Sequence, residues 1–154
     1  MSTINTYNDI FRRDSLKAKF EEIDDSIYVA EASLTNAEIL ALNTTPIEVV
    51  AAPGAGKVLE LVGATLIFDY GTTQMASGGA VVLEEETSGT DLSSTVAAAV
   101  IQAAADSIHT MTPVAAVTVA NKGIFITNAT ADFTTGVACA IRVKVSYRVH
   151  STGL

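Results

Sequence analysis

Tryptophan is missing from this chain of 154 residues, and cysteine and histidine are nearly missing. The single Cys139 excludes an internal disulfide, suits a reducing compartment and is expected to be buried and inert. The two histidines, His109 and His150, lie far apart without the spacing of a zinc site. The lack of Trp and the scarcity of aromatic residues disfavour a sugar-binding face, which typically exposes Trp or Tyr.

Positive charge is also scarce, with 9 Lys and Arg against 17 Asp and Glu and a net charge of −8. No Lys or Arg occurs between Lys57 and Lys122, so the middle of the chain has no basic stripe. We therefore expect neither a nucleic-acid nor a membrane partner, because both need concentrated basic residues. The N-terminus lacks the apolar core of a signal peptide, and the longest weakly polar stretch, 95–105, is too short to span a bilayer.

Signatures of catalysis and of cofactor binding are lacking too. The run Gly54-Ala55-Gly56-Lys57 falls short of a phosphate-binding loop because Val58 follows it where Ser or Thr is required. An acidic cluster at 84–86, with Asp91 and Asp69 nearby, lacks the ligand spacing of a calcium loop. The sequence predicts a protein that is not an enzyme and that holds no metal or cofactor.

What the chain does contain is apolar and small residues. Hydrophobic residues make up 49% and charged residues 17%, which is typical of a globular domain rather than a disordered chain. A domain of this length buries about 70% of its unfolded surface. The weakly charged surface favours an oligomer, in which neighbouring subunits cover part of it.

The chain is organised around the stretch 45–71. It reads as two strands, the second from Lys57 to Tyr70, joined in a hairpin by the turn Pro53-Gly54-Ala55-Gly56. The second strand carries apolar residues at both sets of alternate positions, which predicts that a second sheet covers one face and another subunit or arm covers the other. Gly63 predicts a bend or bulge in it.

Further elements follow from local patterns. Thr35 and Glu38 form a capping box for a helical turn over 36–42. The Ala-rich run 92–108 favours a helix, with a buried strand as the alternative for part of it. Loops are expected at 71–79 and 87–91. Strands are expected at 26–34, 80–86, 113–120, 123–128 and 136–150, the third and fourth joined in a hairpin at Asn121-Lys122-Gly123.

These patterns predict a mainly β fold: a sandwich or jelly roll of about seven to eight strands, with one short Ala-rich helix and an N-terminal arm. We expect two parts, an arm or short helix over residues 1–25 and a β-sandwich domain over 26–154. The last strand has the cleanest alternation, with one apolar face and one face that carries Arg142, Lys144 and Arg148. That basic face is a candidate partner-binding surface, and a solvated outer face of a sheet is the alternative.

Residues 1–25 differ from the rest of the chain in carrying four basic and six acidic residues. Their apolar spacing makes a short amphipathic helix plausible over 14–23. Three alternatives remain open: a helix packed on its own domain, an arm that reaches a neighbouring subunit or another protein, and disorder. Under the second, the candidate partner-binding residues are Ile10, Phe11, Arg12, Arg13, Leu16 and Phe20.

Two passages carry a resemblance to a known family. The run TPIEVVAAPGAGKV (45–58), followed by a long strand and Tyr70-Gly71, resembles small virion proteins of tailed bacteriophages, as does NKGIFITN (121–128) before the amphipathic terminal strand. The resemblance covers roughly residues 34–149. It implies a capsid decoration (cement) or head-fibre subunit, a homotrimer bound to the major capsid protein on the virion surface after assembly in the host cytoplasm. The alternative is a tail or fibre module that contacts another tail protein or the host surface.

Overall fold

The computed structural model describes residues 26–86, 89–115 and 118–153, which form nine strands and two short helices. The larger sheet has the order β1-β9-β3-β6, the second sheet β2-β7-β5 and the third β4-β8, all with antiparallel neighbours. The bounds are β1 Tyr28–Leu34, β2 Ile47–Val50, β3 Lys57–Asp69, β4 Thr73–Ser77, β5 Val81–Glu85, β6 Ser107–Met111, β7 Ile124–Asn128, β8 Phe133–Val137, β9 Ala140–Ser151, α2 Asn36–Leu40 and α3 Ala98–Ile101.

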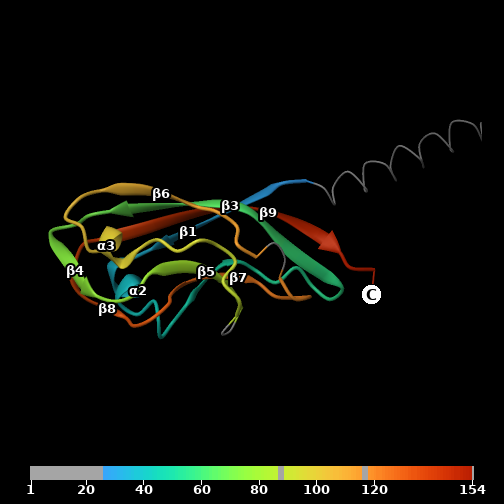
Figure 1. Ribbon diagram of the computed structural model, residues 1–154, viewed down its shortest axis with the longest axis horizontal. Helices are drawn as coiled ribbons and strands as arrows, with labels where there is room; N and C mark the ends of the chain where they lie inside the picture. Colours follow the sequence, from blue (N-terminus) through green and yellow to red (C-terminus); the bar gives the residue numbers. More distant parts are fainter. Residues whose placement is uncertain (1–25, 87–88, 116–117, 154) are drawn as a thin grey trace, which may run out of the picture.

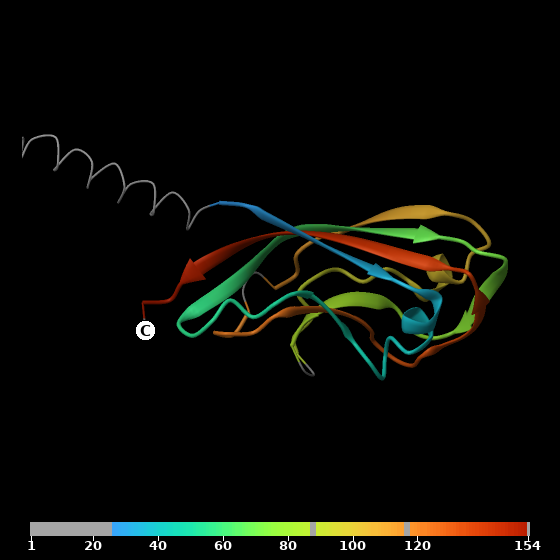
Figure 2. The same cartoon turned by 180° about the vertical axis from the view of Figure 1, so that it is seen from behind.

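Two of the sheets face each other. Figures 1 and 2 show the four-stranded sheet as one layer and the three-stranded sheet as the other, with β4 and β8 at one end of the molecule. Apolar side chains from both layers fill the space between them, among them Phe68, Leu83 and Ile126, each fully buried. The predicted mainly β fold is confirmed, with nine strands in the described residues rather than seven or eight, and the jelly-roll alternative stays a prediction.

The apparent two-sided apolarity of β3 is the result of a bulge. The register with β9 pairs Leu61 with Tyr147 and then Gly63 with Ser146, so Val62 is an extra residue in β3. Leu59 and Leu61 before the bulge, and Leu66 and Phe68 after it, therefore all face the core. The bulge predicted at Gly63 is confirmed, but the prediction that both faces of this strand are strongly apolar is wrong.

The predicted hairpin between β2 and β3 does not form, because β2 pairs with β7 in one sheet and β3 pairs with β9 and β6 in the other. The turn itself exists: Gly54 and Gly56 have φ values of 99° and 71°, which glycine adopts without strain. The Asn121 side chain accepts a hydrogen bond from the Gly54 N–H at 3.0 Å. The turn therefore carries the chain from one layer to the other, since the partners of each strand come from distant segments.

Three further local predictions are wrong. The stretch 71–79 is not a loop, because β4 forms within it and pairs with β8. Only Ala98–Ile101 of the Ala-rich run is helical. The last two residues of the run begin β6, an edge strand in which Ile108 is exposed, and not the buried strand that was the alternative. The described part of 113–120 contains one isolated bridge, from Pro113 to Ser93, and no strand, so the hairpin at Asn121-Lys122-Gly123 is also absent.

The strands predicted at 26–34, 80–86 and 123–128 and the helical turn predicted at 36–42 are confirmed. The arm or short helix predicted over 1–25, and part of the loop predicted at 87–91, lie outside the described residues. The helical turn begins at Asn36, where the Glu38 N–H donates to Thr35 Oγ1 and the Thr35 N–H donates to Glu38 Oε2 at 2.7 Å, a complete capping box. The predicted terminal strand is divided in two: β8 ends at Val137, Ala138 has a positive φ of 59°, and β9 begins at Ala140. In the described part of the chain, no helix is long and apolar enough to cross a membrane.

Candidate functional site: the outer face of the larger sheet

The solvent-facing side of β1, β9, β3 and β6 is called the outer face below. Alternation along β9 turns Ile141, Val143 and Val145 toward the core. The intervening residues therefore lie on the outer face, and they include Arg142, Lys144, Arg148 and His150. The structure thus brings together the three basic residues that the sequence predicted as one surface.

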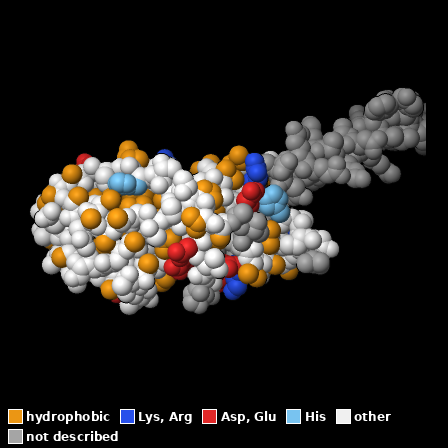
Figure 3. All heavy atoms as spheres, viewed as in Figure 1, with side chains coloured by type: hydrophobic (Ala, Val, Ile, Leu, Met, Phe, Trp, Pro, Cys, Tyr) orange, Lys and Arg blue, Asp and Glu red, His pale blue; other side chains and the backbone are white. Residues whose placement is uncertain are grey.

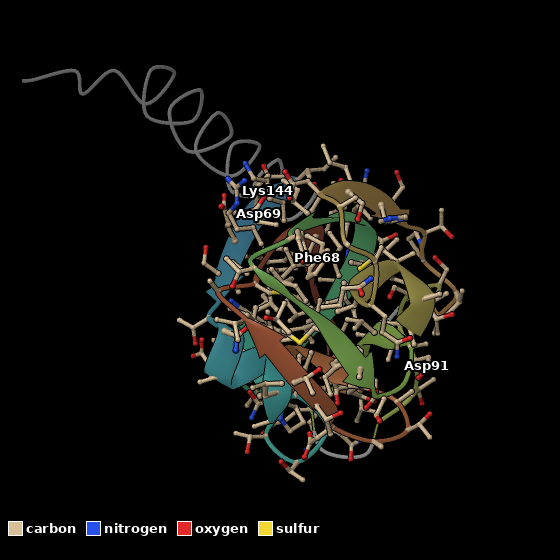
Figure 4. All side chains as sticks on the ribbon, turned by 90° about the vertical axis from the view of Figure 1, so that its left-hand side faces the viewer. Phe68, Asp69, Asp91 and Lys144 are labelled. Atoms are coloured by element: carbon tan, nitrogen blue, oxygen red, sulfur yellow. The ribbon has the colours of Figure 1, made fainter. Side chains whose placement is uncertain are left out.

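Each of these basic residues has an acidic neighbour on an adjacent strand. Lys144 Nζ lies 3.3 Å from Glu31 Oε2, its register partner on β1. Arg142 Nη2 lies 3.6 Å from Asp69 Oδ2 on β3, the strand that flanks β9 on the side opposite to β1. Figure 4 shows Lys144 and Asp69 both at the surface of the larger sheet, four register positions apart along it, and Phe68 inside the molecule. Both pairs are nearly half exposed, so each contributes little to stability and mainly neutralises the face.

Glu60 joins two residues of β9 toward the end of the sheet near the C-terminus. Its Oε2 accepts a hydrogen bond from Arg148 at 3.3 Å and lies 2.8 Å from His150 Nε2. The pKa of Glu60 lies below its ordinary value, chiefly because His150 hydrogen-bonds its carboxylate. Partial burial raises this pKa, and the hydrogen bond and charge of Arg148 lower it. The carboxylate is therefore held ionised between two partners.

Exposed apolar side chains also lie on the outer face. Val29 on β1 is 69% exposed and Ile108 on β6 is 70% exposed, one on each edge strand. Val62, the bulge residue, is 36% exposed, and Ile67 is partly exposed beside Ile108. The outer face thus combines three basic residues, three acidic residues and a set of exposed branched aliphatic side chains.

The other predicted site residues belong to the N-terminal segment and lie outside the described residues: Ile10, Phe11, Arg12, Arg13, Leu16 and Phe20. Whether Arg142, Lys144 and Arg148 bind a partner stays a prediction. Their pairing with acids nevertheless removes the net positive charge on which an attraction for an acidic partner depends.

The alternative chemical sites show ordinary structural roles. Lys57 is the first residue of β3, directly after the turn at Gly54. A phosphate-binding loop requires a helix in place of this strand. Among the described residues, no group of three His, Cys, Asp or Glu side chains is placed to hold a metal ion. Burial, followed by the charge of Asp91, raises the pKa of Glu84, as expected for crowded carboxylates. Cys139 is buried, as predicted, and its N–H donates to Asn36 Oδ1 at 3.1 Å.

Sequence reasoning missed Glu31, Glu60 and Asp69 as part of this face and treated His150 as an ordinary surface residue. His150 follows the same alternation as Arg148, so its place on the face could be read from the sequence. The three acids could not be placed in that way, because only the cross-strand register brings them beside β9.

A comparison with solved structures finds a chain titled "Cyanophage Pam1 capsid asymmetric unit". The two chains are 21% identical, the match covers 80% of this chain and 84% of that chain, and the TM-score is 0.53. At this identity the likeness shows a shared fold. No family model matches the sequence, and no curated protein matches it.

Proposed function

We propose that this chain is a non-enzymatic structural protein of a tailed-phage virion: a decoration or cement protein that binds the capsid surface as a homotrimer and stabilises the shell. The observation that carries the proposal is the fold shared with a chain of a phage capsid asymmetric unit. The resemblance of 45–58 and 121–128 to small virion proteins points to the same class independently. The major capsid protein is the proposed partner, and assembly takes place in the host cytoplasm.

The size of the match supports an accessory protein. The likeness covers nearly equal shares of both chains, 80% and 84%, so the two chains are of similar length. It therefore relates two small domains as wholes, rather than this domain and one part of a much larger shell subunit. A small domain that is complete in itself suits addition to an existing lattice.

The proposed mechanism is mechanical. A copy that bridges two neighbouring capsomers buries surface that only the assembled shell offers. Its binding free energy then stabilises the shell relative to the dissociated subunits, by the same mass action that stabilises any protein with a bound ligand. A standard interface of about 1,600 Å² per contact is sufficient for stable occupancy. In this proposal, residues 1–25 and the rim of the domain supply the contacts to the capsid.

The proposal is tested on heads assembled without this protein. Purified full-length chain and a variant lacking residues 2–25 are each added at several concentrations, and occupancy is measured by co-sedimentation and shell stability by thermal release of DNA. We expect the full chain to saturate a fixed number of sites per head and to raise the release temperature, and the shortened chain to bind much more weakly.

The outcomes separate the parts of the proposal. Unchanged occupancy by the shortened chain removes the role of the arm and leaves decoration intact. A full chain that does not bind heads, but that microscopy locates on the tail of the particle, replaces decoration with the tail or fibre alternative. Absence from both head and tail overturns the virion proposal.

A further inference from the structure

We propose that the outer face of the larger sheet is the surface through which copies of this chain associate with one another. The inference deepens the proposed function, on which it rests for the presence of an oligomer, by assigning the surface that joins the subunits. It makes a second copy of this chain, rather than the capsid lattice or a nucleic acid, the occupant of the face.

Electrostatics favours this face for contact between identical molecules. Its three basic residues, Arg142, Lys144 and Arg148, are each paired with one of Glu31, Glu60 and Asp69, so the face is neutral. The remaining described residues contain eight acids and only two basic residues, a net charge of minus six. Two identical acidic molecules repel wherever their charged surfaces meet, and the outer face is where they approach without that cost.

The distribution of charge is visible on the molecular surface. Figure 3 shows acidic atoms over the region of β5, where Glu84 and Glu85 end the strand. Figure 4 places Asp91, the acidic neighbour of Glu84, well away from Lys144 and Asp69. The cluster of Glu84, Glu85 and Asp91 is therefore remote from the outer face, and contact through that face keeps the clusters of neighbouring copies apart.

Exposed apolar side chains supply the attraction. Val29, Val62 and Ile108 are three of the seven large hydrophobic residues that are exposed in the described chain, and all three lie on this one face. Because Val29 and Ile108 occupy the two edge strands, the apolar contacts extend across the full width of the sheet. Burying such residues stabilises association in proportion to the apolar area removed from water.

The area of the face is sufficient for a stable contact. Strands β3 and β9 pair over twelve positions, β1 adds seven residues and β6 adds five. With about 3.3 Å per residue and about 4.8 Å between strands, the face measures roughly 600 Å² in projection. Neighbouring copies that cover this face therefore bury on the order of 600 Å² of each subunit, the lower end of the range per partner for specific interfaces. The preformed ion pairs need no charged group from the partner.

The test compares two Val-to-Glu variants of the full-length protein. Val29→Glu places the new charge on the outer face, and Val137→Glu places the same charge on β8, where Val137 is 52% exposed. Ile108→Glu and Val29→Lys test the opposite edge and the opposite sign of charge. Mass is measured by light scattering between about 1 and 100 µM, and circular dichroism checks that each variant is folded.

We expect wild type and Val137→Glu to show a multiple of the 16.0 kDa chain mass. Val29→Glu, Val29→Lys and Ile108→Glu should dissociate at least about a hundredfold more readily, because an interface does not tolerate an enclosed, unpaired charge. A wild-type mass of 16.0 kDa throughout overturns the inference, including the case in which residues 1–25 of the same chain cover the face. So does an oligomer that survives all three outer-face variants.

Head binding is scored separately with the same proteins. Heads that bind a monomeric wild-type chain leave decoration intact and remove the self-association inference. If the wild-type protein forms an oligomer that Val29→Glu dissociates, but binds no heads, the self-association inference is supported and the decoration proposal is overturned.

Discussion

Deleting Val62 should leave this protein folded, although a one-residue deletion inside a central strand normally reverses the faces of every residue beyond it. Val62 is the unpaired residue of the β3 bulge. Without it, Leu61 still pairs with Tyr147, and Gly63 still pairs with Ser146 as the next residue. All twelve register pairs with β9 survive, and Leu59, Leu66 and the other inward residues keep their faces.

The expected cost follows from the burial of Val62 itself. Its side chain is 36% exposed, so about two-thirds of it is buried, and full burial of a valine contributes about 1.5 kcal/mol. The deletion should therefore cost about 1 kcal/mol and lower the Tm by about 2–4 °C for a chain of this size. Val62 lies on the proposed association face, so the protein with Val62 and the protein without it are both compared as Val29→Glu variants. Because these variants are expected to be monomeric, their measured stability does not depend on protein concentration.

Deletion of Lys144 is the matched control. It lies in β9 at a position without a bulge, paired with Glu31 and Thr65. Its loss turns the side chains on one side of the deletion out of the core, for example the fully buried Ile141 and Val143. Each loss costs about 2–5 kcal/mol, so the chain should lose most of a typical stability of 5–15 kcal/mol. Lys144→Ala, which keeps the register, should be nearly neutral.

Urea and thermal denaturation followed by circular dichroism measure these differences. A Val62 deletion that is as damaging as the Lys144 deletion would refute the bulge as the device that keeps both halves of β3 facing the core. So would a Lys144 deletion that unfolds with nearly wild-type stability.

Three further predictions follow from particular contacts. Thr35→Ala removes the capping box at Asn36 and should lower the urea unfolding free energy by about 1 kcal/mol, and a change of less than a few tenths would contradict the cap. The folded-state pKa of Glu60 is lowered, so its contribution to stability is present above its unfolded pKa of about 4.5 and is lost as the pH falls through the folded value. Glu60→Gln should therefore flatten the decline of the Tm in acid. An unchanged profile of Tm against pH would argue against the His150 contact. The folded-state pKa of Glu84 is raised, so its contribution to stability is fully present below its unfolded pKa and is lost as the pH rises through its folded pKa. Glu84→Gln should therefore raise the Tm at pH 7 but not at pH 3. A lower Tm at pH 7 would contradict the raised pKa of Glu84.

Patterns that are complete within a few residues were predicted correctly. The capping box of Thr35 and Glu38, the alternation along β9 and the burial of Cys139 all follow from neighbouring residues. The mainly β class also follows, because several short apolar runs bounded by turn residues each favour a strand. The candidate site was predicted to the extent that it depends on one strand, which is why Arg142, Lys144 and Arg148 were grouped correctly.

Predictions that depended on pairing over long distances failed. The turn at Pro53–Gly56 was read as a hairpin because its residues suit one, yet β2 and β3 belong to different sheets. The Ala-rich run was read as a helix from propensity, but Ser107–Met111 pairs with β3 as an edge strand, where tertiary contacts outweigh local preference.

The sequence alone determined that the chain is an acidic, mainly β domain whose last strand has one apolar and one basic face, since composition and a two-residue period are properties of the chain itself. Only the tertiary structure decided that the basic face is neutral, because the register of β1 and β3 against β9 brings Glu31, Asp69 and Glu60 to it. It also decided that Val29 and Ile108, 79 positions apart in the chain, share one surface, since β1 and β6 become the two edges of a single sheet.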